Sequence, residues 1–271
     1  MIEKYYNGVI EQVAGGIGNV EHNSILVRYS NDFSIWDLES VNHYKDQTDI
    51  FFTCHEFSYN KIAEAYEPYL GLIRQMFHKY CSGTLEEFME ECDVYKLQRP
   101  VFESYFEKGF CERTEQILID EVEYEQERMR NSIVTMLQKL SEIRPVVIVL
   151  NRFQLASKST MQLSNSLLQV KNKNIGIVLG VNDVQSIPEF AHEEWDAICE
   201  SMDDRNMVYH IGNAGRNMEP DVMDYYSDYE SDDGYRKLNN LVYFLDFDQA
   251  DHHLSKIERR IKFDRICADT V

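Results

Sequence analysis

Two polar residues directly follow the most apolar stretch of the chain, and they are the first candidates for chemistry. The stretch from Pro145 to Leu150 is almost wholly apolar and β-branched, and Asn151 and Arg152 come after it. An unbroken apolar run of this length is typical of a strand buried on both faces, at the centre of a parallel sheet. Ligands of such sheets bind just beyond the carboxyl ends of the strands. Asn151 and Arg152 therefore stand where a catalytic acid is expected.

Other reactive residue types form weaker patterns. Gly15-Gly-Ile-Gly-Asn19 has neither a following Lys-Ser/Thr nor a strong apolar strand before it, so we interpret it as a turn rather than a phosphate loop. The glutamates between 121 and 127 are spaced by two, which does not place neighbours on one helix face, so we interpret them as surface charge. His252-His253 and Cys54-His55 are isolated pairs. We expect no metal site.

The cysteines point to a reducing compartment. None of the six pairs with another at CxxC spacing; they are Cys54, Cys81, Cys92, Cys111, Cys199 and Cys267. Free buried thiols are the simplest interpretation of this pattern.

Alternating apolar segments predict the elements that position these residues. We expect strands at 25–29, 49–53, 146–150, 174–180 and 207–211. We expect helices at 33–41 with Asp32 as N-cap, at 69–80, on both sides of Pro100 within 84–112, and at 114–143, 160–170 and 188–202. Strands that alternate with helices predict an α/β protein with a five-stranded parallel sheet flanked by helices.

The character of the chain changes after this domain. Residues 1–212 form the predicted α/β domain, and residues 213–237 are an acidic flexible loop or linker without apolar periodicity. Residues 238–271 regain helical periodicity and predict a helical extension. Because its apolar side must pack on something and no natural cap ends it, we expect further C-terminal domains.

Composition excludes several classes of function. The formal net charge of -20, from 47 acidic and 27 basic residues, argues against a nucleic-acid surface, which needs a concentrated basic patch. No apolar run is long enough to span a membrane, and the N-terminus lacks the pattern of a signal peptide. We expect a cytoplasmic protein.

The apolar skeleton resembles a known family. Ile25–Tyr29, Val146–Ala156 and Asn174–Asp183 follow one another as in the P-loop ATPases of signalling proteins, and Tyr66–Arg74 resembles the helix after their second strand. Within that group, the chain resembles the AAA-related STAND class, the regulatory ATPase modules that precede helical repeats and output domains in large bacterial regulators. The resemblance covers roughly residues 20–212.

The family's phosphate loop is degenerate in this chain. In the family, Gly-x-x-x-x-Gly-Lys-Ser/Thr follows the first strand, and the resemblance places Ser30 and Ile35 at the glycines, Trp36 at the lysine and Asp37 at the hydroxyl residue. A β-branched residue resists the backbone conformations open to glycine. Trp36 removes the cation and would fill the phosphate space, and Asp32 and Asp37 add negative charge there.

The family's magnesium and base positions are degenerate as well. The resemblance places Asn151 and Arg152 where the family has acids that hold magnesium and polarise the attacking water. An amide binds magnesium less well than a carboxylate, and an arginine cannot act as a general base. Asn182, after the next strand, matches the polar residue that senses the γ-phosphate in the family.

The resemblance thus implies a catalytically inactive ATPase-like regulatory or scaffolding module of a larger signalling protein, without a cofactor. Its implied partners are C-terminal helical-repeat and output domains of the same protein or a separate protein, and a homo-oligomer is compatible with it. The alternative is a nucleotide-binding or weakly active ATPase switch that uses ATP with magnesium, or works without magnesium, with Arg28, Arg152 and Lys158 as phosphate contacts.

A third interpretation is an unrelated α/β enzyme. It is weakened because the chain has no Gly-x-Ser-x-Gly elbow and no GxGxxG fingerprint after a strand.

Overall fold

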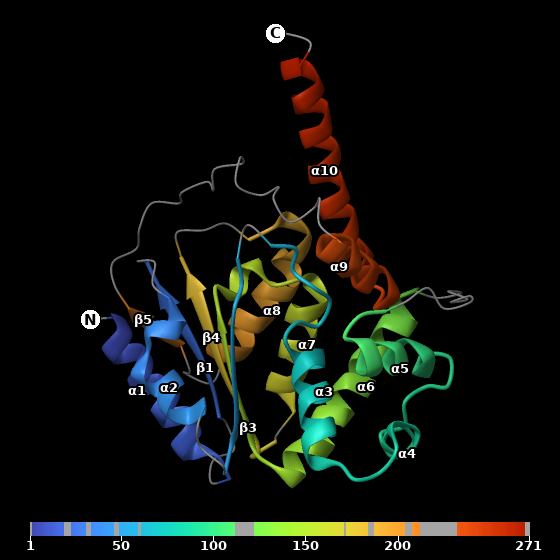
Figure 1. Cartoon of the computed structure of the whole chain (residues 1–271). Coiled ribbons are helices and arrows are strands. Elements are labelled where there is room, and N and C mark those ends of the chain that lie inside the picture. Colours follow the sequence, from blue (N-terminus) through green and yellow to red (C-terminus); the bar gives the residue numbers. More distant parts are fainter. Residues whose placement is uncertain are drawn as a thin grey trace.

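The computed structural model describes residues 2–18, 23–30, 34–45, 49–58, 61–111, 122–170, 172–183, 187–203, 208–211 and 232–268. Within these residues the chain forms an α/β fold, with helices on both faces of one five-stranded parallel sheet and a helical part at the C-terminus (Figure 1). The predicted fold class is confirmed.

The strands are not neighbours in the order in which the chain makes them. They are β1 (Ser24–Tyr29), β2 (Phe51–Glu56), β3 (Val146–Asn151), β4 (Ile175–Asn182) and β5 (Val208–Ile211). Every pairing is parallel, and the order across the sheet is β2-β3-β4-β1-β5. Each strand overlaps its predicted range. Strand β2 differs most, because it ends at Glu56 and not at residue 53.

Helices cover the two faces unequally. One face carries α1 (Ile2–Gly16) and α2 (Glu39–Lys45). The other face carries α3 (Tyr69–Tyr80), α6 (Val122–Ile143), α7 (Lys158–Gln169) and α8 (His192–Asp203) (Figure 1). Two short helices, α4 (Leu85–Glu91) and α5 (Arg99–Lys108), pack against α3. The connections after β1, β3 and β4 contain the 3-10 turns η1 (Ile35–Asp37), η2 (Phe153–Leu155) and η3 (Glu189–Ala191).

Strand β3 has the position that its composition predicts. It lies inside the sheet between β2 and β4, and all six of its residues are buried. Val147 and Val149 pack toward α1 and α2, whereas Ile148 and Leu150 pack toward the helices of the opposite face. Apolar side chains on both faces are what an interior parallel strand requires.

The N-terminal helix corrects the sequence analysis, which predicts only a glycine turn in this region. Tyr6, Ile10 and Val13 recur at helical spacing and are buried where α1 packs on the sheet. Gly180 of β4 permits this approach, because a Cβ there would collide with the Tyr6 hydroxyl. The turn itself is present at Gly18, whose φ is 83°.

The helix predicted at 33–41 is also corrected. The structure has the short turn η1 followed by α2, which begins at Glu39. Ser34 replaces Asp32 as the cap, since its hydroxyl accepts from the Trp36 backbone N–H at 3.3 Å. Leu38 is extended, with ψ of 131°, and separates the two helical pieces. Asp32 and the other residues of 31–33 lie outside the described residues.

The C-terminal helices begin earlier than predicted. Helix α9 spans Asp232–Tyr243 and α10 spans Phe247–Ala268, so the last part of the predicted linker, 232–237, is helical. The rest of that linker, 213–231, lies outside the described residues, as do residues 112–121 before α6. Figure 1 shows α10 extending away from the sheet toward the C-terminus. No helix within the described residues is long and apolar enough to cross a membrane.

Candidate functional site

The predicted site residues gather at one edge of the sheet. The strands are parallel, so their carboxyl ends meet at this edge. Strand β3 ends at Asn151, paired in register with Glu56 of β2, and β4 ends at Asn182, paired with Tyr29 of β1. Ser30 follows Tyr29 directly. Asn151, Asn182 and Ser30 therefore lie at the same edge of the sheet.

Asn151 is fully buried at this edge. Its side-chain Oδ1 accepts a hydrogen bond of 2.7 Å from the Tyr29 hydroxyl. Its Nδ2 has no hydrogen-bond partner among the described residues. The amide oxygen that could approach a cation is therefore already engaged by a side chain of β1, which lies on the far side of β4.

Arg152 is held by a carboxylate. Its φ of 53° lies in the left-handed region and directs the chain into η2. The guanidinium Nη1 lies 3.2 Å from Glu56 Oε1, and the two side chains are only 19% and 13% exposed. An ion pair this far from solvent is weakly screened, so each partner depends on the other.

Glu56 also binds the segment that follows β1. Its second oxygen, Oε2, accepts from the Ile35 backbone N–H at 3.0 Å. Backbone N–H groups at the start of a helical turn and arginine side chains are the groups that bind phosphate in proteins. Here the Ile35 N–H and Arg152 both contact one internal carboxylate, that of Glu56.

Trp36 does not have the place expected for it. We predicted that its side chain would fill the phosphate space, but it is 47% exposed, and the Lys45 ammonium lies 4.4 Å from its ring centroid. Ile35, its neighbour, is the fully buried residue of this turn. The correction follows from η1, in which Ile35 faces the core whereas Trp36 and Asp37 face solvent.

Asn182, the predicted sensor position, is buried at the end of β4. It is 3% exposed, and its backbone N–H donates to Gln154 Oε1 at 3.2 Å. The next residue, Asp183, pairs with Arg28 at 2.7 Å. These contacts tie β1, β3 and β4 together.

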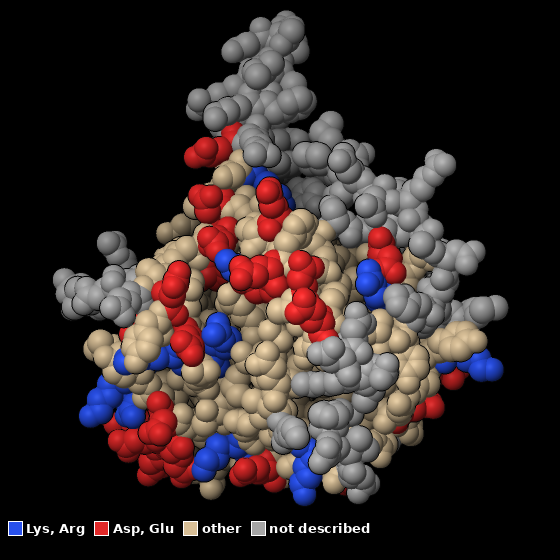
Figure 2. All heavy atoms as spheres, turned by 180° about the vertical axis from the view of Figure 1, so that it is seen from behind, with Lys and Arg blue, Asp and Glu red and all other residues tan. Residues whose placement is uncertain are grey.

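The cations of the alternative nucleotide-binding interpretation do not converge. Arg28 pairs with Asp183, Arg152 with Glu56, and Lys158 with Asp248 and Glu194 at 2.6 and 3.7 Å. Each cation thus has a different carboxylate partner within the chain. On the face drawn in Figure 2, lysines and arginines also form only small groups among Asp and Glu.

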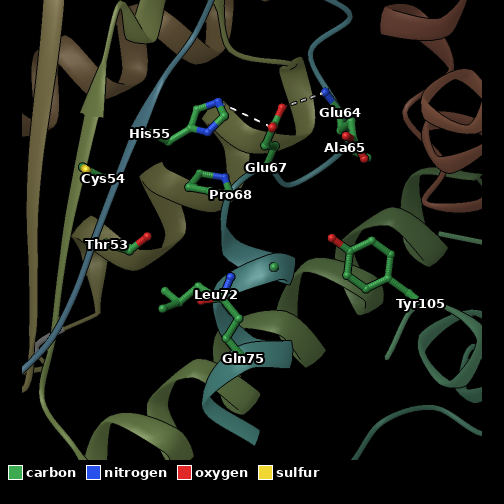
Figure 3. Close-up of a pocket in the computed structure, with 11 residues that line it drawn as sticks. Thr53, Cys54, His55, Glu64, Ala65, Glu67, Pro68, Leu72, Gln75 and Tyr105 are labelled. Atoms are coloured by element: carbon green, nitrogen blue, oxygen red, sulfur yellow. Dashed lines mark hydrogen bonds and ion pairs between the residues drawn. The ribbon is translucent and has the colours of Figure 1, made fainter. Parts of the chain in front are cut away.

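A second polar region lies beside β2, on the face of the sheet that α3 covers (Figure 3). It is a cavity of about 230 Å³ between β2 and α3, and its polar lining consists of Thr53, His55, Glu64, Glu67, Gln75 and Tyr105. His55 Nε2 lies 3.5 Å from Glu67 Oε1. Burial lowers the pKa of His55 to about 4, with Lys61 and Lys237 acting in the same direction and Glu56 opposing them. At neutral pH the imidazole is therefore uncharged.

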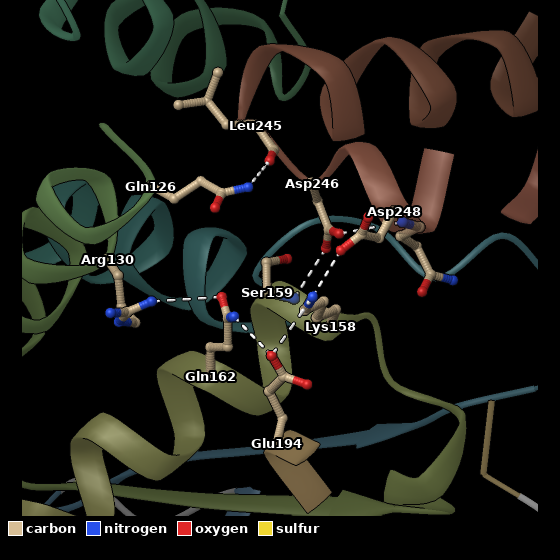
Figure 4. Close-up of polar contacts among 10 residues, drawn as sticks. Gln126, Arg130, Lys158, Ser159, Gln162, Glu194, Leu245, Asp246 and Asp248 are labelled. Atoms are coloured by element: carbon tan, nitrogen blue, oxygen red, sulfur yellow. Dashed lines mark hydrogen bonds and ion pairs between the residues drawn. The ribbon is translucent and has the colours of Figure 1, made fainter. Parts of the chain in front are cut away.

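Contacts at one end of α7 hold the C-terminal helices to the sheet domain (Figure 4). Asp246, between α9 and α10, is buried and accepts from the Ser159 backbone N–H at 2.9 Å. Burial raises the pKa of Asp246, and its hydrogen bonds with Ser159 act in the opposite direction. Lys158 bridges Asp248 of α10 and Glu194 of α8.

The thiol and metal expectations can be assessed for the described residues. Cys54, Cys81, Cys92, Cys111 and Cys199 are free, as expected. Burial raises the pKa of Cys54 to about 11 and that of Cys111 to about 12, so these thiols stay protonated near neutral pH. The part of the chain that the structure describes has no group of three or more His, Cys, Asp or Glu that could hold a metal ion.

Comparison with known proteins assigns the chain to no group. No family model, no curated protein and no solved structure matches it. The functional argument therefore depends on the residues and on the geometry described above.

Proposed function

We propose that this chain is a catalytically inactive ATPase-like regulatory or scaffolding module, which acts through interdomain or protein–protein contacts and needs no cofactor. The observation that carries the proposal is the Glu56 carboxylate, which binds both the Ile35 N–H and the Arg152 guanidinium. In a nucleotide-binding relative, phosphate oxygens would take such contacts. An internal carboxylate satisfies them and repels a phosphate by like charge.

The sheet order supports the resemblance on which the proposal is built. Strand β4 separates β1 from β3, and β5 lies outside β1. The strand that ends in Asn182 thus lies between the strand that precedes Ser30 and the strand that ends in Asn151. The resemblance itself is part of the proposal.

The residues at the edge also support a loss of magnesium chemistry. Asn151 replaces the expected acid, and its oxygen accepts from Tyr29 at 2.7 Å. Magnesium binds carboxylates and phosphate oxygens by preference. The side chain next to it, Arg152, is a paired cation and cannot serve as a base.

A regulatory role further requires a means of transmitting a state, and the C-terminal helices supply one. Phe244, directly after α9, packs with Tyr66, Phe102 and Tyr105, while Asp246 and Lys158 add polar contacts. A shift of α3 or α7 would therefore change how α9 and α10 pack against the rest of the protein. In this proposal α10 passes the change to helical-repeat and output domains of the same protein or to a separate protein.

The test is a titration of the full chain with a fluorescent ATP analogue, with and without magnesium. Tryptophan emission is a useful readout because the exposed Trp36 adjoins the loop. We expect no saturable binding at micromolar concentrations and no rise in melting temperature. Binding with a melting shift would contradict the proposal and leave the nucleotide-binding switch in its place.

A matched variant tests the role of Glu56 itself. Glu56→Gln keeps the side-chain size and removes the charge that faces Arg152. We expect its affinity for pyrophosphate to exceed that of the wild type by about tenfold, or about 1.4 kcal/mol. Equal affinities would show that the carboxylate is not what excludes phosphate.

Repair of the loop alone should not restore turnover. The triple change Ile35→Gly, Trp36→Lys and Asp37→Thr returns the family's residues but leaves Asn151 and Arg152 in place. ATP hydrolysis by this triple variant, measured as phosphate release, would contradict the proposed loss of the acids. Its folding must be checked, because Ile35 is fully buried.

A further inference from the structure

Strand β2 forms one edge of the sheet, and within the described residues no strand lies on its outer side. Each of its six residues is partly exposed, whereas those of the neighbouring strand β3 are all buried. Its two faces are covered, since Tyr44 of α2 stacks on Phe52 and Tyr80 of α3 packs edge-on against Phe51 (Figure 1). The outer edge is therefore the part of β2 that a further strand could contact.

The ladder between β2 and β3 shows which backbone groups point outward. Phe51 and Phe57 each donate a backbone N–H toward β3, at 2.7 and 3.0 Å. Alternate residues of a strand direct their backbone groups to the same neighbour. The N–H and C=O groups of Phe52 and Cys54 therefore point away from β3, and none of them has a hydrogen-bond partner among the described residues.

This edge lacks the features that usually prevent a strand from pairing with another chain, such as a lysine, a proline or a bulge. The sequence of β2, Phe-Phe-Thr-Cys-His-Glu, contains neither lysine nor proline, and its register with β3 runs without a bulge. Its one acid, Glu56, is paired with Arg152. The other edge strand, β5, has four residues and offers a shorter ladder. A further strand is therefore better accommodated at β2.

The strand is complementary to a second copy of itself. In antiparallel pairing about a two-fold axis at Thr53, Phe52 faces Cys54 of the second copy, so two apolar side chains meet and their outward backbone groups bond each other. Thr53 faces its own counterpart, and two threonines on one face of a sheet share a hydrogen bond. Phe51 faces His55 of the second copy, which brings two aromatic rings together.

We propose that two copies of this chain associate through β2, antiparallel about Thr53, and form one continuous sheet. The Thr53 hydroxyl, like that of Tyr105 across the cavity, has no hydrogen-bond partner among the described residues, and the second copy supplies one. The proposal goes beyond the proposed function and does not depend on the loss of ATPase chemistry.

Net charge opposes this association, since each copy carries -20. The repulsion is reduced near β2 itself, because Lys45 acts electrostatically on Cys54 and Lys61 acts on His55. Salt screens the remaining long-range repulsion. The proposed dimer should therefore become more stable as the ionic strength rises.

The test is the mass of the full chain in solution, measured by sedimentation velocity over a series of micromolar concentrations. We expect a monomer–dimer equilibrium that moves toward the dimer with concentration and with added salt. A monomer under all these conditions would overturn the proposal.

Variants locate the interface. Cys54→Pro removes an outward N–H and no bond between β2 and β3, so it should weaken dimerisation at least about tenfold. Thr53→Lys places two like charges on the axis and should do the same. Cys54→Val keeps the N–H and is the matched control, with unchanged dimerisation. Circular dichroism and melting check the folding, and dimerisation of either folded variant as in the wild type would overturn the proposal.

A cross-link tests the register. Residues directly opposite in a non-hydrogen-bonded antiparallel pair have Cα atoms about 4.5 Å apart, within reach of a disulfide. The variant Thr53→Cys, Cys54→Ser should therefore form a disulfide-linked dimer on mild oxidation, seen on a non-reducing gel. Cys54→Ser alone is the control and should not. A double variant that dimerises without this cross-link would overturn the pairing about Thr53.

Discussion

The last residues of β2 serve two regions with opposite properties. Glu56 points toward η1 and closes the strand-end site, where Ile35 and Arg152 contact its carboxylate. His55, its neighbour, points to the other face and lines the cavity, where two hydroxyl groups remain unengaged. The first region lies at the carboxyl ends of the parallel strands, where ligands of such sheets bind, but its Arg152 and Ile35 N–H already contact the Glu56 carboxylate. The second has space and free polar groups, although no sequence motif marks it.

The difference teaches that position in a fold and capacity to bind are separate properties. The parallel sheet determines where strand ends meet, and any sequence with this topology has such an edge. Whether the edge binds a ligand depends on which groups are left for it. Arg152 and the Ile35 N–H are already bound, whereas the Thr53 and Tyr105 hydroxyls have no hydrogen-bond partner in the part of the chain that the structure describes.

The largest expected effect is the loss of the buried pair at the strand-end site. Arg152→Ala leaves Glu56 with little solvent and without its counter-charge, so we expect a loss of about 3 kcal/mol in the free energy of unfolding. Urea denaturation measures it. The double variant Glu56→Ala, Arg152→Ala should be more stable than Arg152→Ala alone, because no unpaired carboxylate remains. Additive losses in this cycle would show that the two residues act independently.

The cavity is expected to respond to acid through His55. The imidazole has a pKa near 6.5 when unfolded and about 4 when folded. Between these values the unfolded chain binds a proton that the folded protein does not, so the free energy of unfolding falls as the pH decreases through this window. Lys61 and Lys237 act in the same direction as burial, while Glu56 opposes them.

The His55 contribution is isolated by a variant. From pH 6.5 to pH 4.5 we expect wild type to lose about 2 kcal/mol more than His55→Gln. The comparison is needed because His253, whose pKa is lowered to about 3, destabilises in the same direction. Asp246, with a raised pKa, acts oppositely. Parallel pH profiles of the two proteins would contradict a buried neutral imidazole at residue 55.

A pair of identical substitutions compares the two regions most directly. Tyr29→Phe removes a buried hydroxyl that donates to Asn151 at 2.7 Å, so we expect a loss of about 1.5 kcal/mol in the free energy of unfolding. Tyr105→Phe removes a hydroxyl without a hydrogen-bond partner among the described residues, and we expect a change within about 0.5 kcal/mol. Chemical denaturation of both variants checks the contrast, and equal losses would remove the distinction between the regions.

The sequence predicts the framework well because the signal is strong there. The runs at 146–150 and 175–180 are apolar without interruption, which is typical of buried strands of this kind. It misses α1, whose stripe of Tyr6, Ile10 and Val13 is interrupted by polar residues and precedes three glycines. Burial of that stripe depends on the sheet, which local periodicity does not reveal.

The sequence predicts which residues lie at the strand ends, but it does not predict the contacts that they make. Asn151, Arg152 and Asn182 lie at the expected edge, but the sequence does not predict Glu56 there, because the predicted strand ends at residue 53 and β2 ends at Glu56. A predicted strand that continued to residue 56 would place Glu56 at its carboxyl end, beside Asn151. The cavity could not be predicted, since Thr53 and Tyr105 are brought together only by the packing of α5 on α3.

The smallest expected effect concerns Trp36, whose side chain the resemblance implies would fill the phosphate space. Because its ring is 47% exposed and contacts Lys45, Trp36→Ala should change the free energy of unfolding by less than about 0.5 kcal/mol. Ile35→Val, one residue away and fully buried, should cost about 1 kcal/mol. Trp36→Ala should also leave pyrophosphate affinity unaltered, whereas Glu56→Gln should raise it. If Trp36→Ala raised that affinity instead, the side chain would be excluding phosphate, and the internal carboxylate would lose its assigned role.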